Sequence, residues 1–139
     1  MKHTSHKLLL AFALAGGLAQ PVLAQTAAET LAQLEQTAKQ TEPSFKGVSP
    51  QRGERLFKTK HGAEWSCASC HSDNPAASGK HAKTGKVITP LAPAANAERF
   101  TRPDKVEKWF RRNCNDVLNR ACTASEQGDV LAYLMTIKN

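Results

Sequence analysis

The stretch Cys67-Ala68-Ser69-Cys70-His71 determines the fold and chemistry to expect of this chain. Its Cys-x-x-Cys-His pattern is the attachment site of a c-type haem. Two thiols on one short helical turn can reach both vinyl groups along one porphyrin edge, and the next residue presents its imidazole to the iron. We therefore predict one covalently bound haem c, attached through Cys67 and Cys70, with His71 as the proximal ligand.

Two other uses of paired cysteines are disfavoured by the surrounding sequence. A thioredoxin-like redox pair would need a βαβ setting, and the sequence shows none. A structural zinc site would need two more ligands at finger-like spacing, and Cys114 and Cys122 are too far apart for a zinc knuckle.

The first residues of the chain indicate export. Lys2 and Lys7 precede an apolar run over residues 8–18, and small residues follow it up to Ala24. This pattern is typical of a secretory signal peptide over residues 1–24, cleaved after Ala24, with an uncleaved anchor as the alternative. The apolar run is short for a transmembrane span. We expect a periplasmic protein that is not itself transmembrane, in a compartment where disulfides persist.

Size and charge limit what the mature chain can be. Residues 25–139 suit a single monohaem cytochrome c domain, in which a buried porphyrin would supply apolar mass. Residues 1–24 hold two lysines and no acidic residue, so their removal lowers the formal net charge from +7 to +5. A basic chain often binds nucleic acid, but an exported protein rarely meets any. An acidic redox partner or an anionic membrane surface is the expected partner instead.

Apolar spacing and capping residues predict an all-α fold with long loops around one haem. The sequence shows no strand-length alternation, no internal repeat and no domain linker. Thr101 with Asp104, and Thr123 with Glu126, are expected to form capping boxes that open the last two helices. The predicted helices cover 26–39, 50–58, a segment that opens at Thr101 and ends within 111–115, and a final segment that opens at Thr123.

The residue opposite His71 would decide the function. Electron-carrying cytochromes c usually place a Met or a second His there. Apart from Met1 the chain has only Met135, which falls within the final helix and is expected in the core. His61 and His81 lie in loops rich in Lys and Gly, where solvated histidines are expected. A lysine would have to lose its proton to bind iron.

Asn113 remains, and the residues alone leave two interpretations of it open. Its amide could bind ferric iron weakly or donate a hydrogen bond to bound dioxygen, or it could cap the C-terminus of its helix. Cys114 and Cys122 can be bridged if the chain turns between them, as Asn119 allows. Such a bridge would stabilise the fold by about 2–3 kcal/mol and stiffen the backbone at Asn113. The sequence leaves open whether this disulfide is purely structural or has a redox role.

The order of the elements resembles a class I cytochrome c. In that family an early helix with Gly and Phe, here Gly53 and Phe57, crosses a C-terminal helix with an aromatic residue, here Tyr133. The resemblance also implies that a backbone carbonyl within 89–91 accepts the Nδ1–H of His71. We thus expect the fold of a class I cytochrome c with an extra N-terminal helix.

A more specific resemblance rests on segments of the second half of the chain. The sequence is similar to the sphaeroides haem protein (SHP) family of oxygen-binding cytochromes c. The similarity is carried by Thr84-Gly85-Lys86 through Pro90-Leu91-Ala92-Pro93, by Arg99-Phe100-Thr101, by Val106-Glu107-Lys108-Trp109, and by Arg112-Asn113-Cys114-Asn115 through Cys122-Thr123.

This resemblance implies a site and partners. His71 would be the proximal ligand, Asn113 the sixth ligand, and Cys114 and Cys122 a disulfide. The Asn of the family leaves the iron on reduction and opens a site for dioxygen, nitric oxide or carbon monoxide. The electron donor of the family is a dihaem cytochrome c linked to a membrane cytochrome b. Trp109 and Phe110 could wall the gas pocket or belong to the core.

Three functions therefore compete. The first is an electron-accepting, gas-binding cytochrome, which could act as a terminal oxidase or reductase of a small molecule such as dioxygen or nitric oxide. The second is a plain electron carrier with a Met or His sixth ligand, which the absence of a loop methionine disfavours. The third is a haem-based binding or sensing module, which nothing in the sequence separates from the first.

Overall fold

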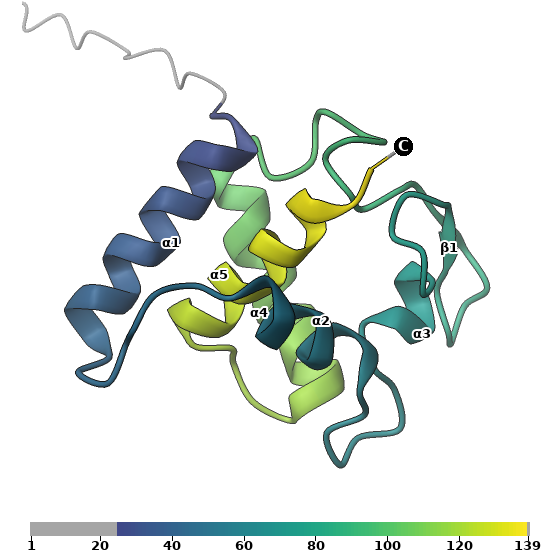
Figure 1. Cartoon of the computed structure of the whole chain (residues 1–139). Coiled ribbons are helices and arrows are strands. Elements are labelled where there is room, and N and C mark those ends of the chain that lie inside the picture. The colour runs from purple at the N-terminus through teal and green to yellow at the C-terminus, as the bar shows by residue number, and fades with distance from the viewer. Residues whose placement is uncertain (1–24, 139) are drawn as a thin grey trace, which may run out of the picture.

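The computed structural model describes residues 25–138, so the predicted signal peptide at 1–24 lies outside the described residues and stays a prediction. The described chain is predominantly helical, with one very small sheet (Figure 1). Its elements, in chain order, are α1 (Ala27–Thr41), α2 (Pro50–Lys58), α3 (Ala68–His71), β1 (Gly79–Lys80), β2 (Val87–Ile88), α4 (Pro103–Leu118) and α5 (Ala124–Thr136).

The core lies where α2 crosses α5. A Cβ on Gly53 would collide with the backbone oxygen of Asp129, so glycine lets the two helices approach this closely. Phe57 and Leu134 are fully buried beside this crossing, and the rings of Phe57 and Tyr133 lie 5.6 Å apart. The crossing predicted from Gly53, Phe57 and Tyr133 is confirmed.

A buried carboxylate fixes the start of α2 to α5. Asp129 is 5% exposed, and its Oδ1 accepts a hydrogen bond from the backbone N–H of Ser49 at 2.6 Å. Arg52 donates to both carboxylate oxygens, at 2.7 and 2.9 Å. This bidentate hydrogen bonding compensates the negative charge of the Asp129 carboxylate, which would destabilise the fold if it were buried without a partner.

The extra N-terminal helix packs on the other helices as an outer layer. In Figure 1, α1 lies to one side of α5, and α3 and β1 lie to the other. Thr26 and Glu29 form the capping box that opens α1. At its far end, Glu42 accepts hydrogen bonds from the backbone N–H and hydroxyl of Ser125, at the start of α5.

Two predicted boundaries of α4 were wrong. The helix begins at Pro103, with Arg102 at the N-cap position, because the Thr101 hydroxyl donates to the carbonyl of Glu98 and leaves the helix uncapped. It also continues past residues 111–115 to Leu118. Asn119 ends it with a φ of 56°, a left-handed conformation that Asn tolerates. The capping box of Thr123 and Glu126 at the start of α5 is confirmed.

One of the long loops, residues 73–89, contains a short antiparallel hairpin, although the sequence shows no strand-length alternation. β1 and β2 pair antiparallel, with Gly79 opposite Ile88. A two-residue strand is too short to show an alternation of apolar and polar residues, so these strands could not be predicted from the sequence. A Cβ on Gly79 would collide with the carbonyl oxygen of Cys70, so this hairpin lies directly against α3.

Among residues 25–138, no helix combines the length and apolar character needed to span a membrane.

Candidate haem site

The Cys-x-x-Cys-His stretch folds as one helical turn. The backbone N–H groups of Cys70 and His71 both donate to the carbonyl of Cys67, at 3.2 and 3.0 Å. Ser72 then ends the turn with a φ of 67°. Cys67, Cys70 and His71 all line one cavity of about 850 Å³, so the three predicted attachment residues open onto a common space.

Part of the wall of this cavity comes from α4. The α4 residues that line the cavity are separated by one, three or four positions in the sequence, so they lie on one face of the helix. Asn113 belongs to this face and therefore opens onto the same cavity as His71. The α4 residues that line the cavity are Lys105, Val106, Trp109, Arg112, Asn113, Asp116 and Val117.

His71 has the properties of a metal-binding imidazole. Burial lowers the pKa of His71 to about 4, with smaller contributions from the charges of Arg99 and His81. The ring is therefore neutral at pH 7, which is the form that coordinates metals. Its Nδ1 is buried, and no hydrogen-bond partner for it is found among the described residues.

The expected carbonyl partner of His71 is already engaged. The Pro90 carbonyl, within the 89–91 segment predicted to accept from His71, instead accepts from Arg99 Nε at 2.9 Å and from the Asn96 amide at 3.4 Å. A guanidinium is the stronger donor, which explains why it occupies this oxygen. Arg99 also donates to the carbonyl and hydroxyl oxygens of Thr89, at 2.8 and 2.9 Å. The prediction of a bond from His71 to this segment was wrong for this structure.

Cys67, at the N-cap of α3, and Cys70, within it, do not resemble a redox pair. Both are free thiols, and burial raises the pKa of Cys67 to about 11. Redox-active Cys-x-x-Cys motifs have lowered thiol pKa values, so the shift is in the opposite direction. Two free thiols beside a buried imidazole, in a cavity within the usual 300–1,000 Å³ range of cofactor sites, fit a covalently attached haem.

Asn113 is not a helix cap. It lies within α4, and the left-handed cap position belongs to Asn119. The following residue, Cys114, is 4% exposed and forms a disulfide with Cys122. The bridge spans the turn at Asn119, as the sequence allowed. The cap interpretation of Asn113 was therefore wrong, and its role as a distal ligand stays a prediction.

Comparisons with known proteins agree with this site. Residues 43–134 match the family described as a domain of unknown function, DUF1924. Over 82 residues the chain is 54% identical to cytochrome c'' of Methylophilus methylotrophus, which covers 59% of this chain and 57% of that protein. Over 88 residues it is 46% identical to the cytochrome c-type protein SHP of Cereibacter sphaeroides, covering 60% of this chain and 67% of that protein. The chain thus spans a little over half of the curated cytochrome c''.

Solved structures extend the similarity to most of the chain. Oxidised SHP, described as an oxygen-binding cytochrome c, superposes with a TM-score of 0.72 at 37% identity, over 81% of this chain and 98% of that one. Oxidised cytochrome c'' from Methylophilus methylotrophus superposes with a TM-score of 0.70 at 41% identity, over 81% and 95%. The chain belongs to the SHP family of c-type cytochromes. The predicted all-α cytochrome fold is confirmed, and membership makes the chain a haem-binding cytochrome with covalently attached haem c.

The other candidate ligands of this SHP-family chain are poorly placed. Met135 is 37% exposed on α5 and is not among the residues that line the cavity, so its prediction as a core residue was wrong. The buried face of α5 is supplied by residues 128–134 instead. His61 is exposed, its Nε2 lies 3.2 Å from the Leu56 carbonyl, and it does not line the cavity either.

His81 differs from its predicted solvated state, because it is partly buried and lines the haem cavity. Its Nδ1 accepts the backbone N–H groups of Lys83 and Thr84, at 3.3 and 3.4 Å. In its neutral form, a ring bonded in this way would carry its proton on Nε2, the nitrogen that would otherwise be available to a metal. This hydrogen bonding makes His81 a poor ligand in the described arrangement.

Several charged residues of the cavity were missed by the sequence reasoning. Arg99 lines the cavity, and so do Lys105 and Arg112 of α4. Arg112 and Lys105 lie one and eight positions before Asn113, which places them near Asn113 on one face of a helix. Helical spacing from Asn113 could therefore have identified both residues. Trp109 lines the cavity and is 48% exposed, whereas Phe110 packs against the core.

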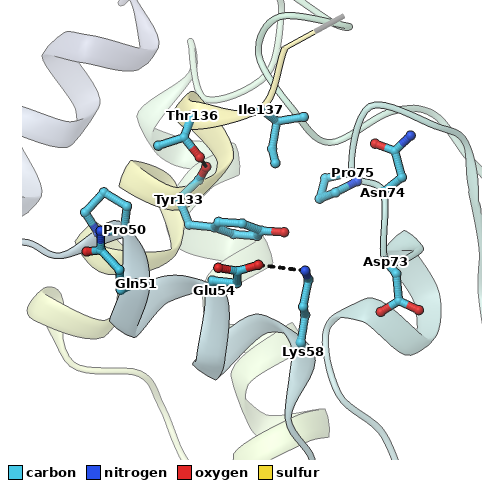
Figure 2. Close-up of a pocket in the computed structure, with 10 residues that line it drawn as sticks. All are labelled: Pro50, Gln51, Glu54, Lys58, Asp73, Asn74, Pro75, Tyr133, Thr136 and Ile137. Carbon is cyan, nitrogen blue, oxygen red and sulfur yellow. Dashed lines mark hydrogen bonds and ion pairs between the residues drawn. The ribbon is translucent and has the colours of Figure 1, made fainter.

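A second pocket of about 490 Å³ lies between α2, the end of α5 and residues 73–75 (Figure 2). The Tyr133 ring lies across it, and Lys58 pairs with Glu54 at 2.7 Å. No residue lines both this pocket and the haem cavity. Tyr133 is linked to His71 through Phe57, whose ring lies 6.4 Å from the imidazole.

Proposed function

We propose that this chain is a periplasmic cytochrome with one haem that accepts an electron and then binds dioxygen, nitric oxide or carbon monoxide at the sixth position of the iron. The observation that carries the proposal is that Asn113 and His71, on different elements, line one cavity. Among the described residues, no methionine lines that cavity, and its second histidine has its Nδ1 engaged. Haem, when bound, supplies the one-electron chemistry and the metal that takes the gas.

The residues of this chain have distinct roles in the proposal. Cys67 and Cys70 attach the porphyrin as thioethers, and the neutral imidazole of His71 is the proximal ligand. Asn113 offers an amide oxygen, a hard and weak donor that suits ferric iron better than the softer ferrous iron. With haem bound, Asn113 would hold ferric iron only weakly, and its amide N–H would be available to donate a hydrogen bond to a diatomic molecule in the cavity.

The charge of the cavity rim favours an acidic electron donor. Arg102, Lys105 and Arg112 line the cavity from the α4 side, and Lys83 and Lys86 line it from the hairpin side. Complementary charges steer redox partners and set their association rates. We propose a dihaem cytochrome c, linked to a membrane cytochrome b, as the donor. Turnover of dioxygen or nitric oxide with excess reductant would make the chain a terminal oxidase or reductase.

Absorption spectra of the ferric and ferrous protein, with and without carbon monoxide, test the proposal. We expect a mainly high-spin ferrous spectrum and rapid formation of a carbon monoxide complex. A low-spin ferrous spectrum that carbon monoxide leaves unchanged would contradict gas binding.

A plain electron carrier is the second candidate, and the position of His81 on the cavity wall is the observation in its favour. Under that alternative, His81→Ala would convert a low-spin ferrous spectrum to a high-spin one. Under the proposed function, the same substitution leaves the ferrous spectrum high-spin.

A further inference from the structure

Phe100 has an unusual backbone conformation for a bulky residue. Its φ is 62°, in the left-handed region that side chains larger than Asn rarely adopt. Phe100 lines the haem cavity and is followed directly by Thr101 and by Arg102, the N-cap residue of α4. A strained conformation of this kind persists only where surrounding contacts hold it.

The contacts that hold Phe100 come from α1, 70 residues earlier in the sequence. The Thr30 hydroxyl donates to the carbonyl of Phe100 at 2.6 Å, and Thr30 is 4% exposed. Gln25 Oε1 is a second acceptor near this hydroxyl, at 3.4 Å, but the single hydroxyl proton favours the shorter bond. The main-chain nitrogen of Gln25, which becomes the terminal amine after the predicted cleavage, donates to the next carbonyl, that of Thr101, at 2.8 Å. The N-terminal segment thus anchors two consecutive carbonyls beside the cavity.

Phe100 transmits this anchoring to the helix that carries Asn113. The Phe100 and Phe110 rings lie 6.3 Å apart, and both pack against the buried core. Phe110 precedes Asn113 by one helical turn on α4. The position of the cavity wall and of α4 therefore depends on the backbone that Thr30 holds.

We propose that Thr30 is a positioning residue for the haem cavity: its hydroxyl holds the left-handed Phe100, and Phe100 fixes the wall of the cavity and the start of α4. The part of this inference that concerns gas entry rests on the proposed function. The simpler alternative is that Thr30 only attaches α1 to the rest of the chain.

Three variants separate these alternatives. Thr30→Val removes the hydroxyl and keeps the shape, and Thr30→Ser restores the donor. Thr37→Val is the matched control on the same helix, because the exposed Thr37 hydroxyl bonds only the carbonyl of Gln33 within α1. Each haem-loaded variant is compared with wild type by carbon monoxide association after flash photolysis and by amide hydrogen exchange.

We expect Thr30→Val to speed carbon monoxide association on the order of tenfold, because a lost buried hydrogen bond raises the population of loosened arrangements. Exchange should rise by roughly the same factor at the Val106 amide, in the first turn of α4, which bonds the Arg102 carbonyl at 2.9 Å. Thr30→Ser and Thr37→Val should resemble wild type in both measurements.

Two outcomes would overturn the inference. One is a Thr30→Val variant with faster exchange in α1 alone and unchanged exchange at Val106. The other is a failure of Thr30→Ser to restore wild-type exchange. If wild-type ferrous protein binds no carbon monoxide, the proposed function fails, and exchange at Val106 still decides the role of Thr30.

Discussion

Asn113 and Cys114 are consecutive residues of α4 that point into different environments. Asn113 lines the haem cavity, whereas Cys114 is buried and bonded to Cys122. One helical step rotates a side chain by about 100°, so one residue can face a cofactor while the next anchors the helix. The disulfide thereby fixes the backbone next to the proposed distal ligand without occupying the cavity.

Asn113→Ala tests the ligand role directly. We expect the ferric absorption spectrum to shift towards that of an iron with water or no protein ligand at the sixth position, because alanine offers no donor. Carbon monoxide binding to the ferrous form should persist, since an amide oxygen suits ferrous iron poorly. Asn115→Ala is the control, because Asn115 lies on the same helix, is exposed and does not line the cavity. Identical ferric spectra for wild type and Asn113→Ala would rule out ligation by this residue.

Replacement of both bridged cysteines by serine tests how far the disulfide supports the site. The bridge closes a separation of 8 residues, and its loss should lower the free energy of unfolding by about 2–3 kcal/mol. Urea denaturation of the oxidised protein and of Cys114→Ser/Cys122→Ser measures this. We expect the ferric spectrum of the variant to become heterogeneous, because the helix at Asn113 is less constrained. An unchanged midpoint and spectrum would show that packing alone holds α4.

The features predicted from sequence are those with a local cause. The haem motif depends on five consecutive residues, and the helix crossing at Gly53 depends on a glycine and an aromatic residue one turn apart. The end of α4 could not be read this way, because Asn113 and Asn119 are both acceptable caps and only the folded chain selects Asn119.

Features that depend on distant contacts were missed for the same physical reason. Arg99 takes the Pro90 carbonyl that the resemblance had implied for His71, and no pattern near Arg99 indicates this. The strained Phe100 is held by a hydroxyl 70 residues away. Tertiary contacts outweigh local preference at such positions, and these positions surround the cavity.

The pH dependence of stability should reflect Glu126, at the start of α5. Hydrogen bonds from Arg120, at 2.7 Å to each oxygen, are the main cause that lowers the pKa of Glu126, and the backbone N–H of Thr123 adds to it. The unfolded state therefore binds more protons near the ordinary Glu pKa. The stabilising effect is complete above that pKa and is lost as pH falls through the folded value.

Glu126→Gln should accordingly lower the free energy of unfolding at pH 7 by about 1 kcal/mol. The effect is no larger because the Arg120–Glu126 pair is partly exposed and solvent screens it. The difference from wild type should shrink as pH falls below the ordinary Glu pKa and through the lowered pKa of folded Glu126, where the wild-type carboxylate gains its proton. Thermal unfolding from pH 7 to pH 3 measures both effects. Glu107→Gln, which removes an exposed pair with Arg111, provides the control and should show little change at any pH. A difference for Glu126→Gln that stayed constant across this range would contradict the linkage.

Gly53→Ala should destabilise the protein although helix propensity alone favours alanine. In an exposed helix the change would stabilise by about 1 kcal/mol. Here the new Cβ meets the backbone of Asp129, which cannot move as a flexible side chain could, so we expect a loss of about 1–3 kcal/mol. Arg55→Ala, on the exposed face of the same helix, should change stability little.

Because Phe57 lies one turn beyond Gly53 and its ring neighbours His71, the Gly53 variant should also shift the haem absorption bands. A stabilised Gly53→Ala protein with wild-type bands would show that α2 and α5 are not in close backbone contact.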